Sequence, residues 1–172
     1  KAGPHDFFSE GPYWWPNPKG PDLPYVRRDG EVNPNRFVDN DRDLAAMSEA
    51  VMTLGMAAAF FDDERYARRA AELVRVWFVD PKTRMNPNLE FGQAIRNVND
   101  GRGIGIIDTV RLLNVPDSVA LLAPSAAWMA KDTAGMRRWF ADYLDWLLTS
   151  PHGKDEDRAT NNHGSWYDAQ AA

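Results

Sequence analysis

The sequence contains no cysteine, and only three of its 172 residues are histidine. Without cysteine the chain can form no disulfide and no thiolate metal site. The absence of cysteine does not indicate the cellular compartment of the protein. His5, His152 and His163 stand far apart in the sequence, and no His-x-x-x-His pattern indicates zinc. No Gly-x-Ser-x-Gly motif surrounds Ser165, which argues against a serine hydrolase. We therefore expect no metal and no other cofactor.

Long hydrophobic runs and a positive net charge are also missing. We find no signal peptide and no apolar run that approaches transmembrane length, so we expect no membrane partner. The net charge of -5 argues against a nucleic-acid partner. An acidic polymer remains a suitable ligand if the arginines converge in one cleft. The chain starts at Lys1 and stops at Ala172, soon after its most reactive-looking segment, so we expect a processed or partial chain.

What the sequence does contain fits one domain with a sizeable core, since 44% of its residues are hydrophobic. Seven tryptophans are many for this length. Indoles fill helical cores and also stack on sugar rings, and we expect most of these to be core residues. Residues 1–40 are rich in proline, glycine and aromatics, and three prolines in residues 11–18 (GPYWWPNP) exclude a helix there. We expect an aromatic loop, with a brief strand and a turn at residues 25–30.

From residue 41 onward, apolar residues recur at spacings of three and four, which predicts amphipathic helices. The first helix reaches residue 61, capped by Asp41 or Asp43, and Asp62 or Asp63 caps a second helix that forms an antiparallel hairpin with it. We expect a short helical turn at 89–95 and further helices at 104–113, after 117, and at 133–149. The sequence Asn114-Val115-Pro116 should end one helix, and residues 154–158 should be a solvated charge cluster. The predicted class is all-α.

Two motifs suggest other sites. Residues 39–43 (DNDRD) resemble the start of a calcium loop, but Leu44 and Ala50 occupy the positions of the required glycine and glutamate, so helix capping is the better interpretation. Residues 101–105 (GRGIG) lack the preceding strand and the spacing of a dinucleotide site. Arg102 within them is either a clamp for a substrate carboxylate or a partner in a structural salt bridge.

The strongest chemical signal is the polar stretch at residues 161–168 (NNHGSWYD). Cleaving a uronate polymer by β-elimination requires removal of the C5 proton, which lies alpha to a carboxylate. Asn162 can neutralise that carboxylate with its amide, Arg102 can assist, and His163 can take the proton near neutral pH. The alternative interpretation is that Asn161 and His163 cap a helix or fix a loop.

These segments together resemble the alginate lyase family of polysaccharide lyases. The resemblance rests on the Asn-Asn-His motif, on residues 11–18, on residues 86–90 (NPNLE) and on residues 101–108 (GRGIGIID), and so spans nearly the whole chain. It implies an (α/α) toroid, here a partial catalytic domain, with 1–40 as a groove loop and 41–172 as helical hairpins. It also implies metal-independent cleavage of a 1,4-linked polyuronate, alginate or a relative such as glucuronan, by a periplasmic or secreted enzyme.

On this resemblance Asn162 neutralises the carboxylate and His163 is the base. The family also uses a tyrosine and an arginine, which we expect beyond Ala172 in the remaining half of the domain, because Tyr167 stands too close to the motif. The expected substrate-binding residues are Tyr13, Trp14, Trp15, Arg27, Arg28, Gln93, Arg96, Arg102, Asn161 and Trp166. For Trp14 and Trp15 the alternative is a loop anchor packed on the helices.

Two other functions stay open. The first is a glycoside hydrolase on a similar scaffold, with paired carboxylates such as Asp100 and Asp108. The second is a carbohydrate-binding fragment without turnover.

Overall fold

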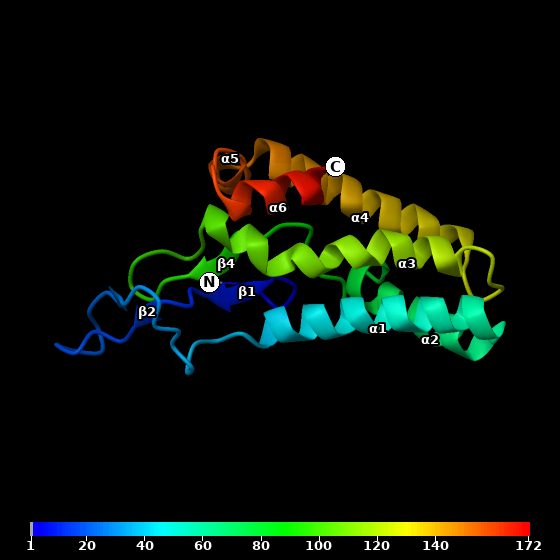
Figure 1. Ribbon diagram of the computed structural model, residues 1–172, viewed down its shortest axis with the longest axis horizontal. Helices are drawn as coiled ribbons and strands as arrows, with labels where there is room; N and C mark the ends of the chain where they lie inside the picture. Colours follow the sequence, from blue (N-terminus) through cyan, green and yellow to red (C-terminus); the bar gives the residue numbers. More distant parts are fainter. Residues whose placement is uncertain (1) are drawn as a thin grey trace.

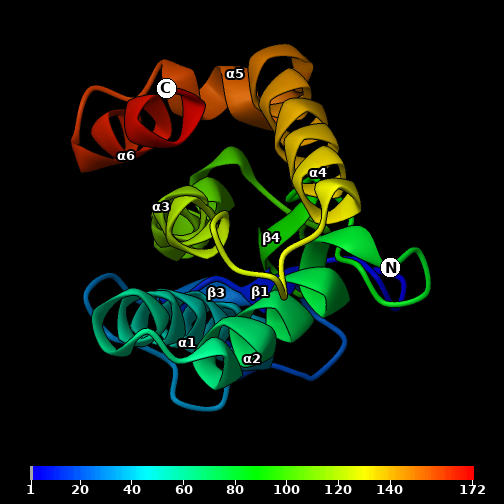
Figure 2. The same ribbon diagram turned by 90° about the vertical axis from the view of Figure 1, so that its right-hand side faces the viewer.

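The computed structural model describes residues 2–172, whose helices lie in three layers (Figure 1 and Figure 2). One outer layer holds α1 and α2, the middle layer holds η2 and α3, and the other outer layer holds α4, α5 and α6. Their bounds are α1 (Asp39–Phe61), α2 (Glu64–Val74), the π-helical segment η1 (Arg75–Val79), the 3-10 helix η2 (Gly103–Leu113), α3 (Asn114–Leu122), α4 (Ala130–Thr149), α5 (Pro151–Asp157) and α6 (Asn162–Ala171). The expected helix-rich, toroid-type architecture is confirmed.

The first two helices form the predicted antiparallel hairpin. Asp62 ends α1 in the left-handed conformation, and the side chain of Asp63 caps α2 by accepting from the backbone N–H of Arg65. The predicted inward stripe consists of Leu44, Met47, Val51, Leu54, Ala58 and Phe61. Its first three residues are buried and the next two are partly buried, but Phe61 is exposed, so the stripe is wrong at its last position. The expected caps of the first helix are wrong, because α1 starts at Asp39 with no side-chain cap and takes Asp41 and Asp43 inside it.

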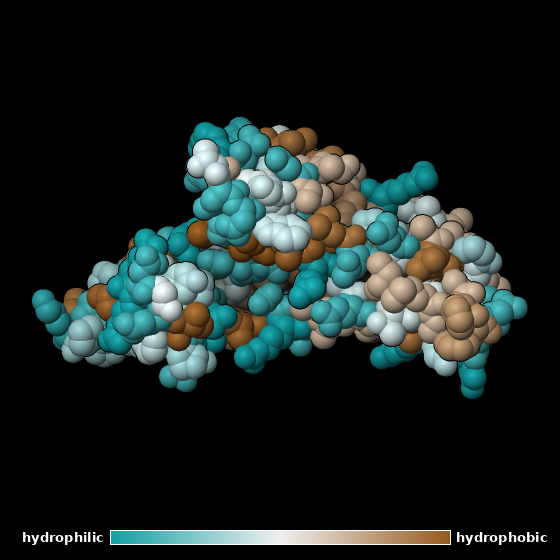
Figure 3. Space-filling model, viewed as in Figure 1, coloured by the Kyte–Doolittle hydropathy of each residue, from teal (hydrophilic) through white to brown (hydrophobic). Residues whose placement is uncertain are grey.

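Helix α1 departs from the sequence expectation in a second way. By length and composition it is apolar enough to cross a membrane, and it is the one such helix in residues 2–172. Its inner face packs on α2, η2 and α3, as the core helix of a layered domain does. Its last turns leave Met56, Phe60 and Phe61 exposed, and Figure 3 shows hydrophobic colour gathered over that end of α1 and α2.

The short strands in residues 2–172 correct one prediction. The helical turn expected at 89–95 is wrong, because the chain there forms strand β4 (Phe91–Ala94), parallel to β1 (Phe8–Glu10). Gln93 has a φ of 49°, which no right-handed helix accommodates. Strands β2 (Trp14–Trp15) and β3 (Val26–Arg27) form a second, antiparallel pair, which confirms the strand expected before the turn at Gly30.

Two prolines sit at helix starts rather than at helix ends. Pro116 lies in the first turn of α3, a position where helices tolerate proline. The predicted stop at Asn114 is therefore wrong, and α3 follows η2 directly. Pro151 likewise opens α5, and this helix contains most of residues 154–158, for which we predicted a solvated charge cluster. That expectation is wrong at one position of consequence, because Glu156 is buried.

The core runs between the layers, and aromatic rings join them. Trp139 of α4 packs edge-on against Phe78 of η1, with ring centroids 4.8 Å apart, and its Nε1 donates to the carbonyl of Met85. Asp132, also in α4, accepts two bonds from Arg75 of η1. Most tryptophans are in or against the core, as predicted: Trp139 is buried, and Trp77, Trp128 and Trp146 are partly buried against it.

Candidate active site

A groove of about 400 Å³ opens where the N-terminal aromatic loop, β3, β4, η2 and the first turn of α6 meet. Seven of the residues predicted from the sequence line it: Tyr13, Trp14, Arg27, Gln93, Arg102, Asn162 and His163. Pro12, Ile104 and Ile107 complete the lining. The fold thus brings together the aromatic loop, the Gly-Arg-Gly segment and the Asn-Asn-His motif.

Trp15 and Arg28 lie outside this lining. Trp15 donates from Nε1 to the carbonyl of Glu31, and the guanidinium of Arg28 lies 4.8 Å from the centroid of its ring. Because side chains alternate along a strand, Trp15 faces away from the groove that Trp14 lines. Trp15 therefore contacts residues of its own loop, and Trp14 lies at the groove.

Arg96, Asn161 and Trp166 also lie outside the groove lining. Arg96 forms an ion pair with the buried Glu10 and faces a separate recess that Tyr25 also lines. Asn161 caps α6, since its Oδ1 accepts from the backbone N–H of His163 at 3.0 Å. Trp166 is exposed on α6. The capping interpretation of Asn161 is confirmed, and its cap presents Asn162 and His163 at the start of the helix.

His163 has a partner that the sequence did not reveal. Its Nδ1 lies 2.7 Å from Oε1 of Glu156, whose side chain is only 5% exposed. Burial raises the pKa of Glu156, while the hydrogen bond and charge of His163 and the charge of Arg102 oppose that rise. The one signal in the sequence was Pro151, which is a favourable first residue for a helix. This helix, α5, carries Glu156 on its buried side.

Arg102 is held in the groove by neutral oxygens. Its Nε donates to the backbone carbonyl of Gln93 at 2.9 Å, and its terminal NH2 donates to the Gln93 side-chain oxygen at 3.0 Å. Burial is the main cause that lowers the pKa of Arg102. Within residues 2–172 no carboxylate forms a salt bridge with it, so the structural salt-bridge interpretation is wrong. The groove therefore holds a partly buried cation that an anionic ligand can neutralise.

A buried network fixes Gln93 in turn. Its backbone N–H donates to Oγ of Ser9 at 2.8 Å, and its Nε2 donates to Asp108 at 2.7 Å. The Ser9 hydroxyl donates to the second oxygen of Asp108 at 2.6 Å. Burial raises the pKa of Asp108 despite these donors. Asp108 therefore stabilises the position of Gln93 in the groove wall and does not itself face the groove.

The glycines on both sides of Arg102 permit close backbone contact. A Cβ on Gly105 would lie 2.4 Å from the carbonyl carbon of Gly92 in β4, and one on Gly103 would lie 2.6 Å from the carbonyl oxygen of His152. Gly105 thus seats η2 on β4, and Gly103 seats it on α5. The Gly-Arg-Gly segment is the point where the strand, the helices and the cation meet.

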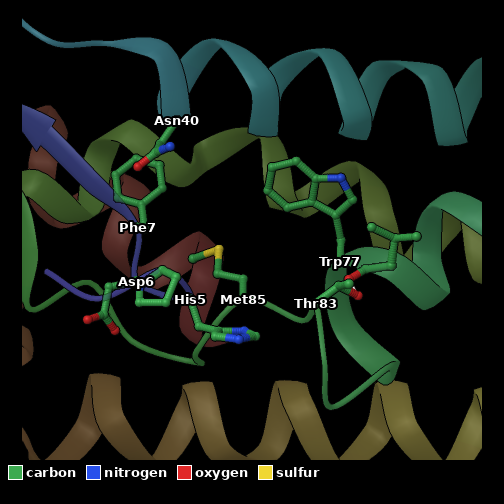
Figure 4. Close-up of a pocket in the computed structure, with 9 residues that line it drawn as sticks. His5, Asp6, Phe7, Asn40, Trp77, Thr83 and Met85 are labelled. Atoms are coloured by element: carbon green, nitrogen blue, oxygen red, sulfur yellow. The ribbon is translucent and has the colours of Figure 1, made fainter.

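The described part of the chain also has a pocket apart from the groove, and it has no cluster of metal-binding side chains. No group of three or more His, Cys, Asp or Glu side chains in residues 2–172 could hold a metal ion. A separate pocket of about 260 Å³ lies between the N-terminal segment and η1, where His5, Phe7 and Trp77 surround it (Figure 4). None of the predicted site residues lines that pocket.

Comparisons with known proteins relate the chain to a family and to a solved structure. The profile of the family described as Alginate lyase matches residues 1–172. A crystal structure of an alginate lyase from Bacteroides ovatus superposes with a TM-score of 0.88 and shares 46% sequence identity. The match covers 97% of this chain and 45% of that one, so the chain spans less than half of its structural relative. No curated protein matches the chain.

Proposed function

The chain belongs to the alginate lyase family, and we propose that its groove binds a 1,4-linked polyuronate, alginate or a relative such as glucuronan, and cleaves it by β-elimination. The observation that carries this proposal is the convergence of Arg102, Asn162 and His163 on one groove. A cation, an amide and an imidazole are the groups that this reaction needs on one side of the sugar.

The proposed chemistry begins at the substrate carboxylate. Arg102 and Asn162 neutralise its charge, and the N-terminus of α6 adds a positive dipole end beside Asn162. With the carboxylate neutralised, the C5 proton becomes acidic enough for His163 to remove. The electron pair of the C5–H bond then forms the C4–C5 double bond, and the C4–O4 bond breaks.

The leaving O4 needs a proton from an acid. Tyr167 does not fit this role, because it is buried and its hydroxyl donates to the carbonyl of Leu147 at 3.0 Å. Tyr143 is also buried, and its hydroxyl lies 3.1 Å from the side-chain oxygen of Gln170. A tyrosine and a second arginine from the remaining half of the family's catalytic domain stay our prediction for the acid and its partner.

The proposal is tested with His163→Ala in the full-length protein on alginate and on glucuronan. We expect the variant to form no product with a C4–C5 double bond, measured by absorbance at about 230–240 nm, because the base is removed. His5→Ala is the matched control, since His5 lies in the separate pocket. Undiminished product formation by the His163 variant contradicts the assignment of the base.

A glycoside hydrolase is the first alternative, and the structure weakens it. Asp108, one of its two candidate carboxylates, bonds to Ser9 and Gln93 and does not line the groove. Cleavage that yields reducing ends without a double bond would favour this alternative. Binding of alginate without any product would favour the second, a binding module. We also propose that the protein acts in the periplasm or outside the cell, because its proposed substrate is an extracellular polymer.

A further inference from the structure

We propose that Glu156 is a positioning residue that keeps His163 in the tautomer whose Nε2 is free to accept the C5 proton. This inference rests on the proposed role of His163 as the base. It assigns a function to a buried carboxylate that contacts the Asn-Asn-His motif, in a segment where the sequence indicated only solvated charge.

The hydrogen bond decides which ring nitrogen carries the proton. An ionised carboxylate can only accept, so a 2.7 Å contact between Oε1 of Glu156 and Nδ1 of His163 places a proton on Nδ1. In the neutral imidazole, Nε2 then keeps its lone pair. With Nδ1 engaged on Glu156, Nε2 is the nitrogen left for a substrate in the groove that His163 lines. When Nε2 takes the C5 proton, the ring becomes a cation that Glu156 stabilises.

The backbone holds the carboxylate in place. Ser150 caps α5 by accepting from the N–H of Gly153 at 2.9 Å, which fixes the start of the helix that carries Glu156. Gly103 lets this helix approach η2 closely, because any side chain there would meet His152 and Asp155. Glu156 and His163 come from two short helices, α5 and α6, and the contacts of α5 hold Glu156 in place without the hydrogen bond to His163.

Burial raises the pKa of Glu156, and the charges of two neighbouring groups oppose that rise when the ring becomes a cation. Arg102 acts on it from the start of η2 and His163 from α6, and both favour the carboxylate. Asp155 on the same helix opposes them, but Asp155 is itself paired with Arg158 at 2.6 Å. The carboxylate of Glu156 thus contacts the proposed base, and the charge of the cation proposed to hold the substrate carboxylate favours its ionised form.

The test uses Glu156→Gln and Glu156→Asp in the full-length protein, with Asp155→Asn as the matched control on the surface of the same helix. Nitrogen-15 chemical shifts of the His163 ring report the tautomer directly, whether or not the protein has activity. We expect the Nδ1–H tautomer in the unmodified protein and in Asp155→Asn, and a mixture of tautomers in Glu156→Gln. We also expect kcat to fall about 10- to 100-fold in Glu156→Gln while KM changes little.

The possible outcomes separate this inference from the proposed function. An Nε2–H tautomer in the unmodified protein overturns the role of Glu156 without any variant, and so does an unchanged kcat in Glu156→Gln. If His163→Ala stays active while the tautomer depends on Glu156, the proposed base is wrong but the positioning contact is real. If Glu156→Gln fails to fold, Glu156→Asp and the tautomer of the unmodified protein still decide the question.

Discussion

The guanidinium of Arg102 is gripped by two oxygens of a single residue, the backbone carbonyl and the side-chain amide of Gln93. Gln93 has a backbone φ of 49°, a left-handed conformation that costs free energy in a residue with a side chain. Ser9 and Asp108 hold it there. A strained residue in a groove thus fixes the cation that we propose to neutralise the substrate.

Replacing Arg102 by lysine should therefore impair activity although the charge is kept. A single ammonium cannot reproduce the planar pair of bonds to Gln93 and still face a carboxylate. We expect kcat/KM on alginate to fall by about 100-fold, as for the loss of roughly 3 kcal/mol of transition-state stabilisation. Arg158→Lys, at the exposed residue that follows α5, is the control. Activity within twofold of the control in Arg102→Lys would contradict the clamp.

Replacing Gly105 by alanine should disturb the same site through the backbone. The added Cβ would lie 2.4 Å from a backbone carbon of β4, so either η2 or β4 must move, and Arg102 moves with it. We expect a loss of about 2 kcal/mol in the free energy of unfolding, measured by urea denaturation. Gly20→Ala serves for comparison, because its Cβ would lie 3.9 Å from the nearest atom. Equal stability of the two variants would show that the close contact is unimportant.

The pH dependence of stability should carry a contribution from Asp108. Burial raises its pKa in the folded state above its value in the unfolded chain. Its contribution is therefore fully present below the unfolded pKa and is lost as pH rises through the folded pKa. Asp108→Asn removes this contribution, so the difference in unfolding free energy between unmodified protein and variant should shift steadily in favour of the variant as pH rises. If the free energies of unfolding of the unmodified protein and of Asp108→Asn change in parallel between about pH 3 and about pH 7, this contribution of Asp108 is contradicted.

The ion pair between Arg75 and Asp132 should matter for stability rather than for activity. Asp132 is fully buried, and it accepts two bonds from Arg75 at 2.9 and 2.7 Å. Asp132→Ala leaves the arginine without its partner, and we expect a loss of about 3 kcal/mol in the free energy of unfolding. Glu72→Ala breaks the exposed pair with Arg69 and should cost about 0.5 kcal/mol or less. A similar loss in both variants would show that burial of the pair is irrelevant.

Local sequence signals predicted the elements whose stability is local. Apolar spacing and the Asp63 cap were enough for the α1–α2 hairpin, because both act within a few turns of helix. The pairing of β1 with β4 could not be predicted, since these short strands lie far apart in the chain and have no alternating pattern. Proline was misinterpreted at Pro116, because a proline in the first turn starts a helix as readily as it ends one.

The same division applies to the candidate site. The local polar motifs and the family resemblance singled out Arg102, Asn162 and His163, and the fold brings them to one groove. Glu156 was missed because charge density indicated solvent, whereas only the packing of α5 on η2 buries that carboxylate. The sequence could not tell which tryptophan of the aromatic loop lines the groove. Neighbouring residues on a strand face opposite sides, and of the two tryptophans only Trp14 reaches the groove.

The most direct test of the account is the chemical nature of the product that the full-length protein forms from a polyuronate. Incubation with alginate and with glucuronan should give oligosaccharides with an unsaturated sugar at the new non-reducing end, seen by absorbance at about 230–240 nm and by a product mass one water lighter than that from hydrolysis. This product should disappear in His163→Ala and persist in His5→Ala. Saturated oligosaccharides, or an unsaturated product that persists at full rate without His163, would contradict the account.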